Sequence, residues 1–354
     1  MKHALFQERV NPFCSRRDEA ITLFQFSSVQ FSSVQFSSVQ FSSVQFSSVQ
    51  FSSVQFSSVQ AYVKLAYEIA KFCHPVETKK SNKVFFRSLL FPHISYQWYR
   101  FIANSNLLSE LVQQKKQLAE KPHRHQLRLD IPIKQRLKLL IQHYTVLEQL
   151  FEAGFLRQVL LNQGAVIARV EISPDEIFEL VLMFGGNESK EGELAIIWRR
   201  TGQKPLAKIR FSLLPKDKQI DVYIAGLQGA QGENRRERVA EASKLMSGLS
   251  PSRIVLEGCL AFANAINAKT VLCVADNQQI SKSKVNKHFS YDDYWLDVGG
   301  VLNQQGDYEI PLVIQRKLKE DTPRKRRAKY RRQHEFLDII YANGLELLQS
   351  RLSE

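Results

Sequence analysis

Hydrophobic residues between positions 61 and 161 recur at intervals of three and four, the spacing that places them on one face of a helix. Pro92, Pro122 and Pro132 interrupt this pattern and divide it into several helices. The clearest of these is expected over residues 133–155, where one face carries Leu137, Leu140, Ile141, Tyr144 and Leu147. We therefore predict that residues 61–161 form a helical region.

The pattern then changes to short runs rich in β-branched and aromatic residues, which are typical of strands. Glycine, asparagine and proline separate these runs, so the connections are short and neighbouring strands must be antiparallel. Strands are expected at residues 165–171, 177–184, 193–198, 207–213 and 220–225. The sequence therefore predicts an antiparallel β meander.

A different unit follows the meander. Residues 226–232 are expected to form a glycine-rich turn that opens a charged helix over residues 233–246. A second helix is expected over residues 251–267 because Ser-Pro is typical of a helix start, and it leads into a strand at 270–274. The predicted fold class is α+β: a helical N-terminal half, then an α+β domain over residues 162–348 with the meander, a strand-turn-helix-helix-strand unit and a basic C-terminal segment.

Residues 26–60 consist of the pentapeptide FSSVQ written seven times without variation. A period of five places successive Phe side chains on no common face of a helix or a strand. We predict a disordered linker here, preceded by a disordered leader at residues 1–25. Tandem copies of the pentanucleotide TTCAG can encode the repeat, so we hypothesise that slippage in the gene makes expression phase-variable. Such switching suits a bacterial gene whose product alters contact with a host.

The composition bounds the class of protein. With 354 residues and 44% hydrophobic composition, the chain can form one large domain or two modest ones. It has no apolar run long enough for a transmembrane helix, and its charged N-terminus lacks the apolar core of a signal peptide. The expected location is the cytoplasm, with peripheral attachment to the inner membrane as an extension. The cysteines lack CxxC spacing and are expected to be buried thiols: Cys14, Cys73, Cys259 and Cys273.

The charge of the chain predicts an anionic partner. The formal net charge is +14, which favours nucleic acid, an acidic membrane surface or a phosphorylated small molecule. The positive charge is concentrated near the C-terminus, at Arg316, Lys317, Lys319, Arg324, Lys325, Arg326, Arg327, Lys329, Arg331 and Arg332. The alternative interpretation is a basic helix that faces only solvent.

The glycine-rich turn is the first candidate binding site. Glycines at the end of a strand let the backbone approach a phosphate, and the helix that follows directs free N–H groups and its positive dipole end at the anion. The candidate residues are Gly226, Gln228, Gly229, Gly232, Arg235 and Arg236. Neither the P-loop signature nor GxGxxG is present, so the alternative is a turn with a bulge and no ligand.

Residues 291–300, YDDYWLDVGG, are the second candidate site. Asp292 and Tyr294 could act as general base and acid. The alternative is that Asp292 caps a short helix that ends at the Gly299-Gly300 pair. No metal-binding spacing, HExxH motif or GxSxG motif is present, so zinc hydrolysis and serine-nucleophile chemistry are poorly supported.

Several motifs carry a resemblance to a known family. Residues 224–276 read IAGLQGAQGENRRERVAEASKLMSGLSPSRIVLEGCLAFANAINAKTVLCVAD, residues 291–300 read YDDYWLDVGG and residues 310–333 read IPLVIQRKLKEDTPRKRRAKYRRQ. With KPHRHQL at 121–127 and the pair His143-Tyr144, these motifs resemble the VirK/YbjX family of Gram-negative bacteria over about residues 62–348. The resemblance implies a virulence-associated protein that affects envelope properties, including surface-protein display and resistance to cationic peptides, with no established reaction.

The chain departs from the family pattern at two positions. Ser247 stands where the family has His in His-Gly-Leu-Arg-Pro, and Gln279 stands where the family has His after the next strand. If those histidines carry a reaction in the family, their absence marks its loss in this chain.

The order of elements also looks like that of GNAT-type acyltransferases, in which a splayed strand pair and the turn after it hold the pantetheine and pyrophosphate of acyl-CoA. The likeness implies acyl-CoA as cofactor, with Asp292 or Tyr294 managing a proton. One alternative is a non-enzymatic envelope factor whose basic segment docks on anionic lipid. Another is a nucleic-acid-binding protein, although the segment offers no aromatic platform beyond Tyr330.

Overall fold

The computed structural model describes residues 53–186, 190–280, 289–316 and 323–353. The chain divides into two compact units, Met1–Glu120 and Lys121–Glu354, and each is described by itself. The leader at residues 1–25 and most of the repeat, residues 26–52, lie outside the described residues.

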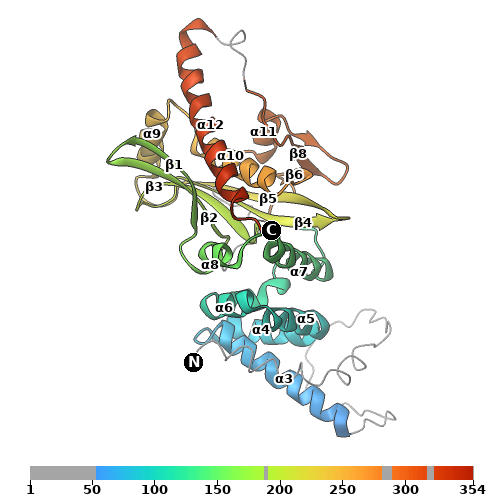
Figure 1. Ribbon diagram of the computed structural model, residues 1–354. Helices are drawn as coiled ribbons and strands as arrows, with labels where there is room; N and C mark the ends of the chain where they lie inside the picture. The colour runs from blue at the N-terminus through green and yellow to red at the C-terminus, as the bar shows by residue number, and fades with distance from the viewer. Residues whose placement is uncertain (1–52, 187–189, 281–288, 317–322, 354) are drawn as a thin grey trace. The chain divides into compact units, whose positions relative to one another are not determined.

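The described part of the first unit is helical. Its elements are α3 (Ser53–Cys73), α4 (Thr78–Leu90), α5 (Pro92–Asn104) and α6 (Asn106–Gln114), after which the 3-10 helix η1 (Lys116–His123) follows (Figure 1). Helix α3 begins inside the sixth copy of FSSVQ, eight residues before the boundary expected at Ala61. Pro92 opens α5, and the Ser105 hydroxyl caps α6 by accepting the N–H of Leu108 at 3.0 Å.

The second unit is built on one eight-stranded sheet with the order β1-β2-β3-β4-β5-β6-β8-β7. The strands β1 to β5 form the predicted antiparallel meander, β5 pairs with β6 in parallel, and the remaining pairs are antiparallel. The α+β fold class is therefore confirmed. The strand bounds are β1 (Ala165–Ser173), β2 (Glu176–Phe184), β3 (Leu194–Arg200), β4 (Ala207–Lys216), β5 (Gln219–Gly229), β6 (Thr270–Val274), β7 (Val301–Leu302) and β8 (Asp307–Ile310).

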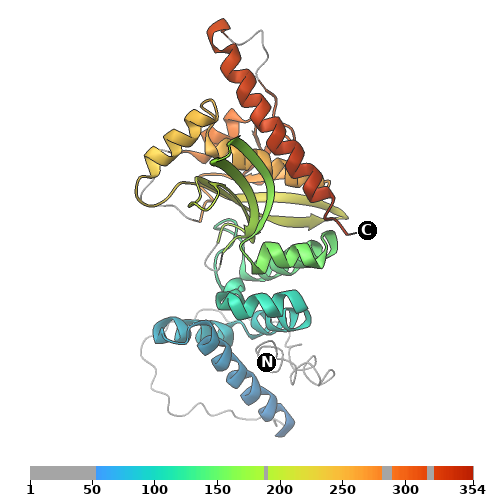
Figure 2. The ribbon, with the colours of Figure 1, turned by 60° about the vertical axis from the view of Figure 1, so that its left-hand side comes forward.

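Helices pack on this sheet and bury its apolar side chains. Helix α10 (Pro251–Ala265) contacts β3, β4 and β5, and the long α12 (Arg327–Gln349) contacts α10 and β1 (Figures 1 and 2). At Gly258 of α10 a Cβ atom would lie 2.3 Å from the Leu180 side chain, so glycine allows the helix to approach β2 closely. The core includes the ring pair Phe211 and Phe262, whose centroids are 5.0 Å apart.

Two helices that precede the sheet in the chain also pack on it. Helix α7 (Ile133–Leu150) contacts β4, and α8 (Ala153–Leu161) contacts β1 and β2. They therefore belong to the second unit, whose start at Lys121 lies well before the change from helical to strand patterning at residue 161. A change of periodicity marks a change of secondary structure, and it need not mark a boundary between compact units.

The glycine-rich stretch differs from the prediction. Strand β5 continues to Gly229, so residues 226–229 are strand rather than turn, because their backbone stays paired with β4. The connection to α9 (Arg235–Leu245) is confined to residues 230–234. The described cysteines, Cys73, Cys259 and Cys273, are buried thiols, as expected, and Cys14 lies outside the described residues. Among the described helices, none is both long and apolar enough to cross a membrane.

Candidate functional site

Strands β5 and β6 run side by side for only part of the length of β5. Residues 221–224 of β5 pair with 270–273 of β6, whereas β5 continues to Gly229 beside β4. The pairing with β4 shifts at Ala225, because Phe211 is opposite Ile224 and Arg210 is opposite Gly226. Among the described residues, the β6-facing backbone of residues 225–229 therefore has no strand partner, and we call this unpaired edge of β5 the wedge.

The side chain of Tyr291 occupies the wedge. Its hydroxyl accepts the N–H of Leu227 at 2.9 Å and donates to the C=O of the same residue at 2.9 Å. The side chain is 5% exposed, and burial raises the pKa of Tyr291, which keeps the hydroxyl protonated and able to donate. Tyr291 belongs to α11 (Tyr291–Asp297), and Trp295 of the same helix donates its indole N–H to the C=O of Val274 at 3.0 Å. Helix α11 therefore bridges β5 and β6 where they part.

The start of α11 is tied to the end of β6 by reciprocal hydrogen bonds. Asp276 accepts the N–H of Tyr291 at 3.0 Å and the hydroxyl of Ser290 at 2.9 Å. In return, Asp292 accepts the N–H of Asp276 at 2.9 Å. The N-cap of the helix is Ser290, which accepts the N–H of Asp293 at 3.0 Å. The predicted short helix exists, and Asp292 stabilises its start from the first turn rather than from the cap position.

The structure gives Asp292 and Tyr294 separate surroundings. Asp292 faces the end of β6, while the hydroxyl of Tyr294 is buried near Ser252 and Arg253 at the start of α10. Burial raises the pKa of Tyr294, so this phenol stays protonated. A joint acid–base role would require one ligand to reach both groups.

Glu191 lies against the first part of the predicted anion site. A Cβ atom at Gly226 would lie 2.5 Å from its Oε2 atom, so only glycine leaves room for this carboxylate. The same oxygen accepts from Arg210 at 2.7 Å and from the Gln228 side chain at 3.0 Å. The Glu191 residue is 2% exposed. Gly226 and Gln228 therefore hold a carboxylate of the protein itself, which repels a second anion at the same place.

The second part of the predicted anion site is open. Nothing lies within 4 Å of a Cβ atom placed at Gly229, and only the Lys204 ammonium, at 3.9 Å, lies near one placed at Gly232. Arg235 and Arg236 are exposed in the first turn of α9. The side chain of Asn234, the residue before the helix, makes no capping hydrogen bond. The turn that leaves the wedge therefore has the Lys204 ammonium beside Gly232 and leads directly into a helix that begins with Arg235 and Arg236.

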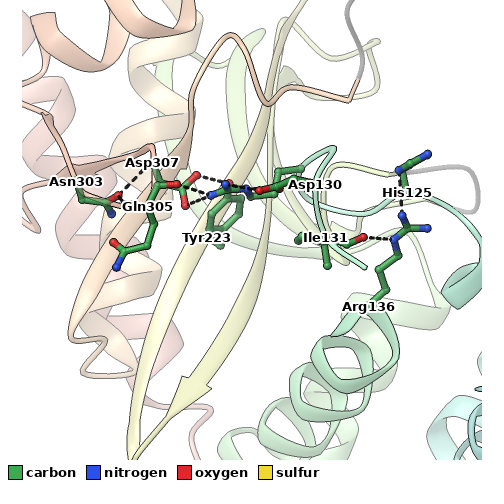
Figure 3. A network of polar contacts seen from close by, with 9 residues as sticks. His125, Asp130, Ile131, Arg136, Tyr223, Asn303, Gln305 and Asp307 are labelled. Carbon is green, nitrogen blue, oxygen red and sulfur yellow. Dashed lines mark hydrogen bonds and ion pairs between the residues drawn. The ribbon is translucent and has the colours of Figure 1, made fainter. Parts of the chain in front are cut away.

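A second polar network lies where β8 begins (Figure 3). Asp307 accepts from Arg128 at 2.6 Å and from the hydroxyl of Tyr223 at 2.7 Å. Arg128 also donates twice to Asp130, and this bond lowers the pKa of Asp130. The N–H of Leu129 reaches the C=O of Gln278 at 3.0 Å. These bonds fasten residues 128–130 to the sheet beside β6 and β8.

A buried ionic cluster connects the start of the second unit to β3. Lys121 donates to Oε2 of Glu193 at 2.5 Å, and the Tyr144 hydroxyl donates to the same oxygen at 2.5 Å. All three residues are buried. Burial lowers the pKa of Lys121, although the adjacent carboxylate opposes this effect. His143, which precedes Tyr144 on α7, accepts the N–H of Leu213 at 3.0 Å, and burial lowers its pKa to about 4.

The basic C-terminal residues separate into two groups. Arg316 is part of the packed unit, because it donates to the C=O of His334 at 2.8 Å and pairs with Glu257 and Asp338. Lys317 and Lys319 lie outside the described residues. The others are exposed around η2 (Arg324–Arg326) and the start of α12, and we call them the basic end: Arg324, Lys325, Arg326, Arg327, Lys329, Arg331 and Arg332.

Sequence reasoning found the glycine turn, the α11 motif and the basic end, and it missed Glu191, Lys204, Tyr291 as an occupant of the wedge, and the Asp307 network. The partners in these contacts are far apart in the chain; Arg128 and Asp307, for example, are 179 residues apart. A local sequence pattern therefore cannot predict such a pairing.

The comparisons with known proteins place the chain in a family. The family described as "Protein of unknown function (DUF535)" matches residues 74–344. The chain is 32% identical over 265 residues to "Uncharacterized protein YbjX" of Escherichia coli K12, covering 73% of this chain and 80% of the relative. This protein belongs to the DUF535 family, which confirms the resemblance to VirK/YbjX proteins.

More distant relatives occur in Haemophilus influenzae Rd. One uncharacterized protein is 25% identical over 213 residues, covering 58% of this chain and 68% of the relative. Another is 27% identical over 175 residues, covering 48% of this chain and 56% of the relative. No solved structure matches the chain.

Proposed function

We propose that this protein is an acyltransferase that uses acyl-CoA, with the pantetheine arm of the donor in the wedge between β5 and β6. The observation that carries the proposal is that the parallel pairing of β5 with β6 ends at Ile224, next to a bulge in the pairing of β5 with β4. It leaves the N–H and C=O of Leu227 directed toward β6 without a strand partner. The proposal is supported by the parallel pairing of β5 with β6 in a sheet whose other pairs are antiparallel.

The wedge suits an amide-containing ligand. Each pantetheine amide has one N–H donor and one C=O acceptor, and Leu227 presents the complementary pair. The Tyr291 hydroxyl occupies both groups, so the ligand must displace this side chain. Because the ligand restores the two hydrogen bonds that Tyr291 gives up, the exchange leaves no buried backbone group unpaired.

The turn after the wedge suits the pyrophosphate of the donor. Gly229 and Gly232 leave open space beside the backbone, and Lys204, Arg235 and Arg236 supply positive charge. Gly226 and Gln228 are not part of this subsite, because they hold the Glu191 carboxylate.

The reaction would join the acyl group to an amine or hydroxyl of the acceptor. The acceptor attacks the thioester carbonyl, a new amide or ester bond forms, and the carbon–sulfur bond breaks. The proton lost by the acceptor ends on the released CoA thiol. Asp292 is not assigned this proton, because its carboxylate helps hold α11 on Asp276.

Isothermal titration calorimetry with CoA and acetyl-CoA tests the proposal. Wild type should bind, and Gly229→Asp should weaken binding by roughly tenfold or more because it sets a carboxylate beside the pyrophosphate. Gly229→Asn is the matched control, since it adds the same volume without charge where nothing lies within 4 Å. Equal affinity of these two variants, or no binding by wild type, would contradict the proposal.

A second candidate is a non-enzymatic envelope factor, and the filling of the seam favours it. Tyr291 occupies the wedge and Glu191 fills the space at Gly226, as in a packed scaffold. Measurement of CoA binding distinguishes the two candidates. The non-enzymatic factor predicts that CoA binds neither wild type nor Tyr291→Ala, in which the wedge is emptied.

The biological setting that accompanies either candidate is an effect on the bacterial envelope connected with virulence and phase-variable expression. It is supported by the VirK/YbjX resemblance and by the uniform FSSVQ repeat. Sequencing the gene from many single colonies tests the switching. Slippage predicts TTCAG tracts that differ in length by single units, whereas scrambled synonymous codons would exclude it.

A further inference from the structure

The proposed acyl transfer does not use the basic end. Its seven exposed cations therefore need another explanation. All seven of its side chains are exposed. The residues of α12 that pack on the sheet and on α10 are farther along the helix: Leu337, Ile340, Gly344 and Leu348 are buried. The first turns of α12 consequently project beyond the sheet in both ribbon views (Figures 1 and 2).

The charge of the projecting segment is predominantly positive. The first turn of α12 contains no acidic residue, and Arg331 has an exposed partner, Glu335, at 3.6 Å. Cations in the first turn also oppose the helix dipole, whose positive end lies there. The arrangement therefore disfavours the free helix and becomes favourable when a dense negative surface neutralises it.

The segment is nevertheless held in a fixed direction. The Gln333 side chain donates to the C=O of Ser247 at 2.9 Å, and the Nζ and Cε atoms of Lys329 lie beside Gly248. Tyr330 is half-buried. The protein thus presents its cations on a projecting helix that is held to the rest of the unit by contacts at Gln333 and Lys329.

We propose that the basic end is a docking surface for an anionic lipid bilayer. A bilayer offers many phosphates in a plane and requires no shape-specific groove, which suits cations that surround a projecting end. Single-stranded nucleic acid, in contrast, is held on several stacked aromatic side chains, and residues 323–332 contain a single aromatic residue, the half-buried Tyr330. The segment exposes no large apolar side chain, so the protein adsorbs to headgroups without insertion, and the attachment weakens as salt rises.

Co-sedimentation with lipid vesicles tests the proposal. The full chain should bind phosphatidylcholine vesicles that contain about one-third phosphatidylglycerol at about 0.15 M ionic strength, and should be released by several-fold more salt. It should not bind vesicles of pure phosphatidylcholine. Each cation near an anionic surface strengthens binding about fivefold, so replacing Arg324, Lys325, Arg326 and Arg327 by Gln should weaken binding by more than about 100-fold.

A matched variant separates the effect of the position of these four cations on vesicle binding from the effect of net charge. Replacing the exposed Lys134, Lys138, Lys216 and Lys269 by Gln removes the same charge from other surfaces and should weaken binding by less than about fivefold. Thermal unfolding of both variants should match wild type, because all eight side chains are exposed. Equal loss of binding in the two variants would overturn the proposal, as would tighter binding of wild type to a DNA oligonucleotide than to the anionic vesicles under the same conditions.

Discussion

The hydroxyl of Tyr291 forms two hydrogen bonds with a single residue, Leu227, accepting its N–H and donating to its C=O at 2.9 Å each. The residues are 64 positions apart and belong to α11 and β5. In the interior of a sheet, such a pair of groups is normally satisfied by a neighbouring strand. Here a side chain supplies the partner, and a side chain can be displaced.

Tyr291→Phe should separate the contribution of the Tyr291 hydroxyl to stability from its competition with CoA for the backbone of Leu227. Without the hydroxyl, the N–H and C=O of Leu227 lose their partner in the free protein, and the free energy of unfolding should fall by about 1–3 kcal/mol. CoA should bind roughly tenfold more tightly, because it no longer competes with those hydrogen bonds. Urea unfolding and calorimetry measure the two quantities. Unchanged stability together with weaker CoA binding would contradict this account.

Two glycines of β5 should respond differently to alanine. Gly226→Ala places a Cβ atom 2.5 Å from the Glu191 carboxylate and should destabilise the protein by about 1–3 kcal/mol through overpacking. Gly229→Ala meets nothing within 4 Å and should change stability by less than about 0.5 kcal/mol. Thermal unfolding checks both, and equal effects would show that Glu191 does not fix Gly226.

The buried pair of Lys121 and Glu193 should behave as a unit. Lys121→Met leaves a buried carboxylate without its cation and should lower the free energy of unfolding by about 3–5 kcal/mol. Adding Glu193→Gln should recover part of this loss, because the neutral amide needs no counter-charge. The control is Lys80→Met at the exposed Glu77 pair, which should cost less than about 1 kcal/mol. Additive effects of the two buried substitutions in a double-mutant cycle would exclude the coupling.

His143 should make stability depend on pH. Its pKa is lowered to about 4 in the folded protein and returns to about 6.5 on unfolding, so the unfolded state binds more protons between these values. The stability contributed by neutral His143 is fully present above about pH 6.5 and is lost as pH falls toward 4, by about 3 kcal/mol.

The matched variant is His143→Asn, which retains an acceptor for the N–H of Leu213 but cannot titrate. Its free energy of unfolding, measured with urea at several pH values, should fall less steeply than that of wild type between pH 6.5 and about 4. Parallel pH profiles for the two proteins would show that His143 is not responsible for the slope.

The sequence predicts the elements that depend on residues close together in the chain. The short β-branched and aromatic runs from residue 165 onward, separated by turn residues, predict the meander, and Ser250-Pro251 predicts the start of α10. Strand β7 has two residues and β8 has four, too few for a periodic pattern. The apolar character of residues 226–229 is weak, so the last residues of β5 resemble a turn although their backbone remains paired with β4.

Only the part of the candidate site that is contiguous in the chain could be predicted from the sequence. The glycines at 229 and 232 and the cations after them are contiguous, and their open turn could be expected from spacing. The carboxylate at Gly226 comes from the connection between β2 and β3, and the hydroxyl at Leu227 comes from α11. Both depend on the order of strands in the finished sheet.

The account rests on the backbone of Leu227 as the ligand-binding edge of the wedge, and amide NMR spectroscopy of the isotope-labelled protein tests it most directly. On titration with CoA, the account predicts that the amide signals of Leu227 and of residues 229–232 shift together and saturate, along with the ring signals of Tyr291. Saturable binding that leaves the Leu227 amide unchanged, or spectra unaffected by CoA throughout, would contradict it.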